Sequence, residues 1–332
     1  MISEQFWREL EAQTPPGAGI VRRRVREGST CNLFIGVAHP RRERVLILVV
    51  SANAASNINL PTTRGLKTIQ TDGGTGEIEL RITLIAPEMK NVFTPFCSDV
   101  IDAVAPADND RVAVSILLKR FANWQRFFAT AGVGLSSLEA QALFGELWVL
   151  EHLFLPLSGV QSVESWRGPD REDRDFLIRG LAIEVKTTSG DEPFTVIIAN
   201  EGQLNVGGLD VLYLVAFKLE VLKGRRGTTL NDAVASIRST LAPEAALLFR
   251  DKLLRYGYLD QHSDRYSDVA YVIREIMTFR VEEGFPRIIE NDLVPGVGSV
   301  RYRLALSACE PWRRTLQELH KAVTDTASGT RG

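Results

Sequence analysis

Asp175, Glu184 and Lys186 are residues whose types and spacing are suited to chemistry. Hard cations such as Mg²⁺ prefer a pair of carboxylates, completed by waters and by oxygens of a substrate phosphate. A metal held in this way activates a water and stabilises developing charge, while an ammonium group orients the nucleophile or the scissile phosphate. The chemistry that fits two acids and a lysine is therefore metal-assisted phosphodiester hydrolysis.

A β-hairpin is the element that would bring the two carboxylates together. Residues 174–178 and 181–186 have the composition of strands, and Arg179 and Gly180 lie between them. A two-residue connection with glycine second is the usual signal for a tight hairpin turn. One face of this hairpin is apolar at every second position and must pack into a core. That face consists of Phe176, Ile178, Leu181, Ile183 and Val185.

The other face of the hairpin carries the charged residues. With a turn at residues 179–180, Asp175 lies directly opposite Glu184, and Asp173 lies opposite Lys186. Directly opposed side chains have Cβ atoms roughly 4.5–5.5 Å apart, where like charges destabilise a sheet unless something compensates. A divalent cation between Asp175 and Glu184 would compensate, and we expect this face to lie outside the core. The alternative is that these acidic side chains are simply solvated, because short motifs are frequent by chance.

The segment 166–203 resembles the PD-(D/E)XK nuclease superfamily. Eight residues separate Asp175 from Glu184, and Glu184-Val185-Lys186 follows the (Asp/Glu)-Xaa-Lys part of its signature. The flanking Trp-Arg-Gly-Pro and the later Gln203-Leu204 are similar to a family of bacterial "PD-(D/E)XK motif proteins". The likeness extends over most of the chain.

This resemblance implies roles for individual residues. Asp175 and Glu184 would be metal ligands for Mg²⁺ or Mn²⁺, Lys186 the catalytic lysine, and Gln203 a polar residue near the scissile phosphate. It also implies an α+β or α/β fold with a restriction-endonuclease-like core, in which a mixed sheet with the order αβββαβ is flanked by helices. The setting it implies is a bacterial restriction-modification or anti-phage cluster, with methyltransferase and ATPase or helicase partners and a possible homodimer.

The sequence departs from the superfamily pattern at one point. The literal Pro-Asp of the superfamily name occurs at Pro169-Asp170 and not before Asp175. The hairpin register favours Asp175 as the metal ligand, because Asp170 lies beyond the predicted strand. Asp173 is the second candidate.

A helix before the hairpin carries a further acid, Glu146. Ser136 and Glu139 have the spacing of a capping box, which predicts that the helix begins at Ser136. Glu146 lies within the apolar stripe that follows, so it points toward the core, where a charge without a partner is costly. We expect the metal site to be its partner, directly or through a water or Lys186, as in superfamily members that supply a Glu from such a helix. The alternative is a glutamate at the core edge that reaches solvent.

Length and composition predict a globular protein with two parts. The chain has 332 residues, of which 45% are hydrophobic and 24% charged. We predict an N-terminal, mainly antiparallel β unit ending in helices over residues 1–131. The nuclease-like domain follows over residues 132–323, and residues 324–332 form a disordered tail. Within the second part we expect strands at 194–200, 211–219, 269–281 and 300–308, helices at 229–241 and 243–256, and a last helix from Pro311. The crossover between the strands ending at residue 200 and starting at residue 211 is short.

The net charge of the chain gives no indication of nucleic-acid binding, because it is −2. Affinity for DNA must therefore come from local clusters of cations. The candidates are Arg167, Arg171 and Arg174 beside the hairpin, Lys223, Arg225 and Arg226 in a loop, and Arg301 with Arg303. N-terminal arginines, such as those at residues 22–24, are better explained as charges that protect a strand edge.

Cysteine usage and hydropathy limit the class of protein further. Cys31, Cys97 and Cys309 lie far apart, so neither a zinc site nor a disulfide framework is indicated. No apolar run approaches the ~18 residues that span a bilayer, and we expect a cytoplasmic protein without membrane contact.

Taken together, these features lead us to expect a metal-dependent DNA endonuclease of the restriction type. A scaffold or DNA-binding subunit that keeps the nuclease fold without activity is the rival interpretation, and hydrolysis of RNA is a third. The full set of two acids, a lysine and Glu146 favours the enzyme, because a scaffold has no physical need for it.

Overall fold

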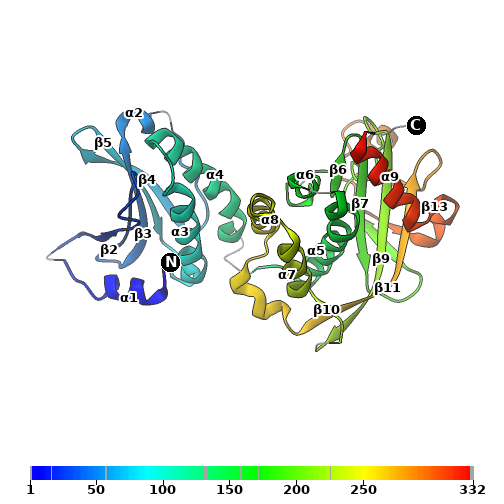
Figure 1. Ribbon diagram of the computed structural model, residues 1–332, viewed down its shortest axis with the longest axis horizontal. Coiled ribbons are helices and arrows are strands. Elements are labelled where there is room, and N and C mark those ends of the chain that lie inside the picture. The colour runs from blue at the N-terminus through cyan, green and yellow to red at the C-terminus, as the bar shows by residue number, and fades with distance from the viewer. Residues whose placement is uncertain are drawn as a thin grey trace. The chain divides into compact units, whose positions relative to one another are not determined.

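The computed structural model describes residues 2–15, 17–56, 58–129, 134–157, 159–170, 172–224 and 226–329. The chain divides into two compact units, Met1–Gly134 and Leu135–Gly332 (Figure 1). The division falls close to the boundary that we predicted at residue 131.

The first unit contains an antiparallel sheet with the strand order β1-β2-β3-β5-β4. Its strands are β1 (Gly19–Arg24), β2 (Asn32–His39), β3 (Glu43–Ser51), β4 (Leu66–Gly74) and β5 (Glu77–Leu84). Its helices are α1 (Glu4–Glu11), α2 (Ala52–Ala55), α3 (Lys90–Val104) and α4 (Asp110–Ala129). The sequence did not predict β4, which forms an edge of the sheet and buries Leu66 alone among its residues, so it lacks an apolar alternation.

The aromatic residues and arginines of the first unit are used in packing and in ion pairs. The ring of Phe96 on α3 contacts Phe121, Trp124 and Phe128 on α4 at centroid distances of 5.8, 5.9 and 5.4 Å. Arg44 is 2% exposed and donates hydrogen bonds to the carboxylates of Glu4 and Glu11. Other arginine–carboxylate pairs of this unit are Arg22 with Glu79, Arg23 with Glu9, and Arg26 with Asp102. The aromatic residues of α3 and α4 therefore pack in a core, and Arg22, Arg23 and Arg26 are paired surface charges, whereas Arg44 forms a buried pair.

The second unit is organised by a mixed sheet with the order β10-β11-β9-β7-β6, and β13 lies beside β11. β6 pairs antiparallel with β7, β7 parallel with β9, and β9 antiparallel with β11. The strands are β6 (Phe176–Ile178), β7 (Leu181–Thr188), β9 (Val211–Lys223), β10 (Thr228–Thr229), β11 (Val269–Val281) and β13 (Arg313–Arg314). The single parallel step joins the hairpin to β9.

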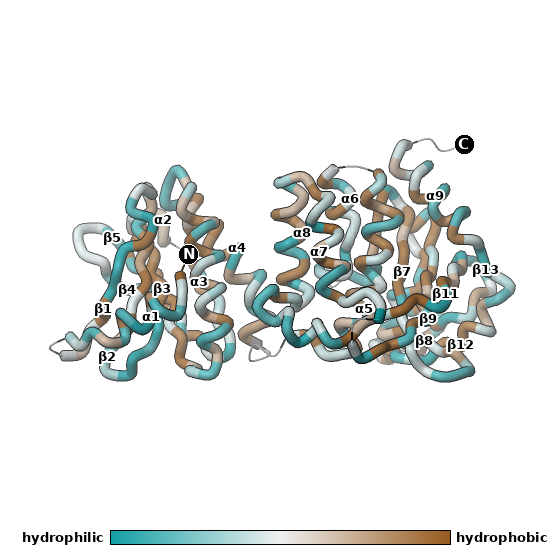
Figure 2. Tube along the Cα trace, turned by 60° about the horizontal axis from the view of Figure 1, so that its bottom comes forward, coloured by the Kyte–Doolittle hydropathy of each residue, from teal (hydrophilic) through white to brown (hydrophobic). Residues whose placement is uncertain are grey.

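Helices and a small second sheet cover the two faces of this mixed sheet. The helices are α5 (Ser137–Val149), α6 (Val160–Glu164), α7 (Leu230–Thr240), α8 (Pro243–Tyr256) and α9 (Leu316–Ser328). Apolar residues of these helices form one core with Phe176, Ile183 and Val185. The opposite face, with Ala182 and Leu214, packs in a separate core with β8 (Thr195–Ile198) and β12 (Tyr302–Ala305). Figure 2 shows hydrophobic tube segments in β7 and β9. The fold is α+β, with mixed and antiparallel sheets flanked by helices, as the sequence predicts for a restriction-endonuclease-like core.

Several predicted elements of the second unit need correction. β8 pairs with β12 in a two-stranded sheet of its own instead of joining the mixed sheet, because β9 pairs with β7 from Leu181 onward. Residues 201–210 form turns and bends and supply no crossover helix. The strand predicted at 300–308 is shorter than expected, and residues 306–312 are a 3₁₀ helix.

The C-terminal helix also differs from its prediction. α9 does not begin at Pro311, because that residue lies inside the 3₁₀ helix, and a capping box at Thr315 starts α9 instead. The helix continues to Ser328, so much of the tail predicted as disordered is helical. Val323 on α9 is fully buried, which explains why the helix extends so far. Within the described residues, no helix combines the length and the apolar composition that a membrane crossing requires.

Candidate active site

The hairpin turn has the predicted geometry. Arg179 and Gly180 have φ angles of 43° and 85°, and two successive positive values are typical of the tight turns that match strand twist. Ile178 pairs with Leu181, which confirms the predicted register. β6 begins at Phe176, so Asp175 is the residue that immediately precedes the strand on the side facing Glu184.

Backbone hydrogen bonds hold Asp175 in place. Its carbonyl oxygen accepts hydrogen bonds from the N–H groups of Arg167 at 2.6 Å and Gly168 at 3.1 Å. Its carboxylate Oδ2 accepts one from the N–H of Val185 at 2.7 Å. Burial raises the pKa of Asp175, although the charge of Lys186 and the Val185 hydrogen bond act against this. Asp175 is therefore fixed against β7 with one carboxylate oxygen already used.

Glu184 is fully buried, which corrects the expectation that its face of the hairpin lies outside the core. Its exposed fraction is 0%, because the second core, to which β8 and β12 contribute, covers this face of the sheet. Glu184 Oε1 lies 2.6 Å from Lys186 Nζ, and Oε2 has no hydrogen-bond donor among the described residues. Burial, and next the charge of Asp175, raise the pKa of Glu184 to about 8. A buried carboxylate oxygen without a donor is costly, and the nearby charge of Asp175 adds to this cost.

Lys186 links the acids to Gln203. Its Nζ contacts Glu184 and donates a hydrogen bond to Gln203 Oε1 at 3.1 Å. The same amide oxygen accepts a hydrogen bond from the N–H of Ala199 at 2.7 Å. Burial lowers the pKa of Lys186, but the charges of Glu184 and Asp175 outweigh it, so the pKa is raised and the ammonium form is favoured. Gln203 therefore orients Lys186 from the turn that follows β8.

Glu146 on α5 joins the site from the other side. It is 5% exposed, its Oε2 accepts a hydrogen bond from Trp166 Nε1 at 2.7 Å, and its Oε1 accepts one from the Tyr256 hydroxyl at 2.8 Å. Burial, followed by the charge of Asp175, raises its pKa well above the usual range, and the two hydrogen bonds oppose this. The sequence predicted that Glu146 points inward, but neither Trp166 nor Tyr256 was predicted as a partner. Trp166 belongs to the Trp-Arg-Gly-Pro motif, which could have indicated a role at the site. No local sequence pattern distinguishes Tyr256 on α8.

Gly168 leaves room for the two carboxylates. A Cβ atom placed on Gly168 would lie 2.2 Å from Glu146 Oε2 and 3.2 Å from Asp175 Oδ1. Both oxygens therefore lie against the same glycine, and any side chain there would displace them. The glycine of Trp-Arg-Gly-Pro is thus required for space in the acidic cluster.

Asp170, in the literal Pro-Asp of the sequence, forms ion pairs away from Glu184 and Asp175. Asp170 Oδ2 lies 3.1 Å from Lys252 Nζ, and Oδ1 pairs with Arg255, both on α8. Lys252 is 3% exposed and also donates a hydrogen bond to the carbonyl oxygen of Trp166. Asp170 thus compensates a buried ammonium, while Asp173 is exposed.

The residues present fit a divalent cation of the kind that the sequence suggests. The unpartnered Glu184 Oε2, and the raised pKa values of Glu146, Asp175 and Glu184, describe a cluster of acids whose negative charge Lys186 and Arg174 offset only in part. In the described part of the chain, no three Asp, Glu, His or Cys side chains are already arranged as a complete ligand group. Mg²⁺ is commonly held by one or two carboxylates, with waters and substrate phosphate completing the shell. Asp175 and Glu184 could hold it in that manner.

The predicted DNA-binding cations are distributed over separate places. Arg174 is half-buried, and its guanidinium donates hydrogen bonds to the carbonyl oxygens of Asp173 and Asn205. Arg167 lies 3.3 Å from the carboxylate of Glu172. Arg171 and Arg225 lie outside the described residues. Arg301 and Arg303 are exposed at the start of β12, beside β8.

The loop with Lys223 and Arg226 is remote from the catalytic hairpin. Glu184 is level with Leu214 on β9, and Lys223 lies nine residues further along the same strand. At about 3.3 Å per residue, this corresponds to roughly 30 Å along the strand. The loop therefore does not directly flank the acids, and its contact with DNA stays a prediction.

Comparison with known families identifies the chain. A family model described as "Putative PD-(D/E)XK family member, (DUF4420)" matches residues 3–307. The chain belongs to this PD-(D/E)XK family. The match includes Glu146, Asp175, Glu184, Lys186 and Gln203, and superfamily members are typically nucleases that use divalent metals. No curated protein and no solved structure matches the chain.

Proposed function

We propose that this PD-(D/E)XK family member is a metal-dependent DNA endonuclease of a restriction-modification or anti-phage defence system, with Mg²⁺ or Mn²⁺ as cofactor. The observation that carries the proposal is the buried, unpartnered oxygen of Glu184 beside Asp175 and Lys186. A purely structural glutamate at this position would be costly, because burial and the charge of Asp175 disfavour its carboxylate form even with Lys186 beside it. A divalent cation at the cluster would supply the missing partner.

The chain's own residues would divide the work of phosphodiester hydrolysis. When bound, the cation supplies a polarised phosphate oxygen and an activated water. Asp175 and Glu184 hold it, and Asp175 is kept in place by the Val185 N–H. Lys186, oriented by Gln203, presents its ammonium group to the negatively charged phosphate.

Glu146 has a separate part in this proposal. Its raised pKa means that it holds a proton more readily than an exposed glutamate. The hydrogen bonds from Trp166 and Tyr256 fix the direction of its carboxyl group. Glu146 can therefore take up or release a proton beside Asp175.

The proposal includes how DNA and partners are engaged. Arg167, Arg171 and Arg174 would contact phosphates next to the hairpin, and Arg301 with Arg303 would extend this contact from β12. Action together with methyltransferase and ATPase or helicase subunits, or as a homodimer, is part of the same proposal.

A cleavage assay with matched variants tests the proposal. Supercoiled plasmid, linear duplex and RNA are incubated with wild type, Lys186→Ala and Glu220→Gln in Mg²⁺, Mn²⁺ or EDTA. Glu220 is the control, since it lies on β9 away from the acids, in an exposed pair with Arg274. We expect cleavage of DNA in the metals only, loss of cleavage in Lys186→Ala, and wild-type activity in the control.

The alternative outcomes are informative. Cleavage of RNA alone would correct the substrate. Retained cleavage in Lys186→Ala would contradict the assigned site. DNA binding without cleavage in either metal would favour the scaffold interpretation.

A further inference from the structure

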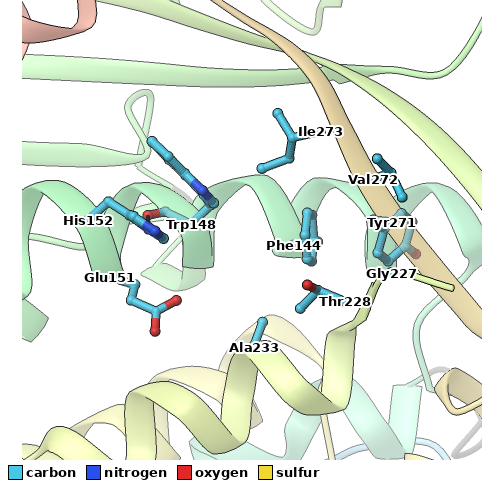
Figure 3. Close-up of a pocket in the computed structure, with 10 residues that line it drawn as sticks. All are labelled: Phe144, Trp148, Glu151, His152, Gly227, Thr228, Ala233, Tyr271, Val272 and Ile273. Carbon is cyan, nitrogen blue, oxygen red and sulfur yellow. Dashed lines mark hydrogen bonds between the residues drawn. The ribbon is translucent and has the colours of Figure 1, made fainter. Parts of the chain in front are cut away.

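A cavity lies in the same unit, away from the acidic cluster. It has a volume of about 390 Å³ and lies between α5, α7, β10 and β11 (Figure 3). Small-molecule sites usually have volumes of roughly 300–1,000 Å³, so the cavity is of a size that holds one small ligand. None of Glu146, Asp175, Glu184, Lys186 and Gln203 lines it.

Aromatic side chains form the walls of this cavity. The ring of Trp148 on α5 stacks on that of His152, which lies in the π-helical turn Leu150–Phe154 that follows α5, with centroids 4.1 Å apart and an interplanar angle of 10°. Phe144 and Tyr271 lie beside them, with ring centroids 4.7 Å apart. Trp148 is half-buried and His152 is exposed, so this wall is open to an incoming ligand. Flat aromatic walls of this kind suit a planar ring, since base–aromatic stacking does not depend on the identity of the base.

Glu151 places an acceptor at one end of the cavity. Figure 3 shows Glu151 and His152 at one end and Gly227 with Tyr271 toward the other. The Glu151 carboxylate accepts a hydrogen bond from the Ser236 hydroxyl, and no cation of the described residues pairs with it. A carboxylate with spare acceptor capacity can take a hydrogen bond from the exocyclic amine of a nucleobase.

The opposite end of the cavity leads into the basic loop. Gly227 and Thr228 line the cavity and directly follow Arg226 in the chain. Lys223 and Arg226 are exposed, and within the described part of the chain no ion pair with an acidic residue is found for either. This loop lies roughly 30 Å along β9 from the level of Glu184 and directly adjoins the cavity, so its charge is available to a phosphate there.

We propose that this cavity binds a nucleoside phosphate unit. The base stacks on Trp148 and donates a hydrogen bond to Glu151, and the phosphate lies against Lys223 and Arg226. This inference goes beyond the proposed nuclease activity and does not depend on it, because none of its residues belongs to the acidic cluster. The unit can be a free nucleotide or one nucleotide of a single strand, since both present the same base and phosphate.

Binding of a fluorescent nucleotide tests the inference. The full-length protein is titrated in EDTA with 2-aminopurine deoxyribonucleoside monophosphate, whose emission is quenched when the base stacks. We expect saturable quenching, and stacking on one aromatic side chain predicts binding that is about 5-fold to 100-fold weaker in Trp148→Ala. Glu151→Gln and Arg226→Ala should also weaken binding. Lys321→Ala is the control, because Lys321 is an exposed cation on α9 that does not line the cavity.

Two further measurements keep the test decisive. Trp148 also packs against Phe217, so thermal unfolding checks that Trp148→Ala is folded. If it is not, His152→Ala on the exposed part of the wall replaces it. Tighter binding of an oligonucleotide with one 2-aminopurine than of the mononucleotide would identify a strand as the source, and equal binding would identify free nucleotide.

The inference is overturned if quenching is absent at millimolar nucleotide, or if the wall, Glu151 and Arg226 variants all bind as wild type does. The result is separable from that of the nuclease proposal. A chain that never cleaves can still bind the probe, and an active nuclease can fail to bind it.

Discussion

Replacing Glu184 by glutamine should remove a large pH dependence from the stability of the metal-free protein. Glu184 is 0% exposed, and burial and the charge of Asp175 raise its pKa from 4.5 to about 8. The folded protein therefore keeps a proton on Glu184 at pH values where the unfolded chain has released it. Because the folded state then binds more protons, the free energy of unfolding falls as pH rises through this window. The protonated Glu184 makes its full contribution to the free energy of unfolding below pH 4.5, and this contribution is lost as the pH approaches and passes about 8.

The size of this effect follows from the shift. One proton difference changes the free energy of unfolding by about 1.4 kcal/mol per pH unit. Across the window from 4.5 to about 8, the upper bound is roughly 5 kcal/mol. Relaxation of the site and entry of water reduce such penalties, so we expect roughly 2–4 kcal/mol between pH 5 and pH 8.5.

Urea unfolding in EDTA across pH 5 to 8.5 measures the effect. We expect wild type to lose stability steadily as pH rises, and Glu184→Gln to be flatter and more stable than wild type at pH 8.5. Glu146 and Asp175 also have raised pKa values, so a smaller slope of the same sign remains in the variant. Glu220→Gln, at an exposed carboxylate of the same sheet, should keep the wild-type slope. Equal slopes in wild type and Glu184→Gln, or a variant less stable than wild type at pH 8.5, would refute the reasoning.

Two further predictions concern neighbouring residues. Asp175→Asn should weaken Mg²⁺ binding, as measured by calorimetry. Asp170→Asn should keep metal binding but lower the melting temperature, because it leaves the buried ammonium of Lys252 without its carboxylate. Loss of metal binding in Asp170→Asn alone would reverse the assignment of the metal ligand. Arg174→Ala should reduce the slope of log affinity against log salt for duplex DNA in Ca²⁺ by about one, uniformly across sequences, and an unchanged slope would exclude a phosphate contact at Arg174.

Local signals account for the parts of the site that the sequence predicts. Arg179-Gly180 sets the hairpin register because a two-residue turn leaves no freedom between its strands. Ser136 and Glu139 set the start of α5, and so the face on which Glu146 lies, because their reciprocal hydrogen bonds form within one turn. In both places the chain segments that decide the structure are adjacent in sequence.

Distant segments account for what the sequence did not predict. Glu184 is buried because Val196 and Leu304, from β8 and β12, contribute to the core on its face of the sheet, and β12 comes more than a hundred residues later. Tyr256 reaches Glu146 from α8 across 110 positions of sequence. The period-two pattern of the hairpin showed an apolar and a charged face, but it contained no information on whether another layer would cover the charged one.

Burial of the charged face gives the site its coupling between protons and metal. An acidic pair in water would bind Mg²⁺ weakly at any pH above about 4, because both carboxylates would already be ionised and hydrated. At Glu184, by contrast, a proton and a cation compete for a charge that Lys186 compensates only in part, since burial excludes solvent from both oxygens. Metal affinity should therefore rise with pH up to about 8, as the proton on Glu184 becomes easier to displace. The core that buries Glu184 thus destabilises the metal-free protein and, for the same reason, favours a bound cation. Lys186 remains beside Glu184 as an ammonium throughout this pH range.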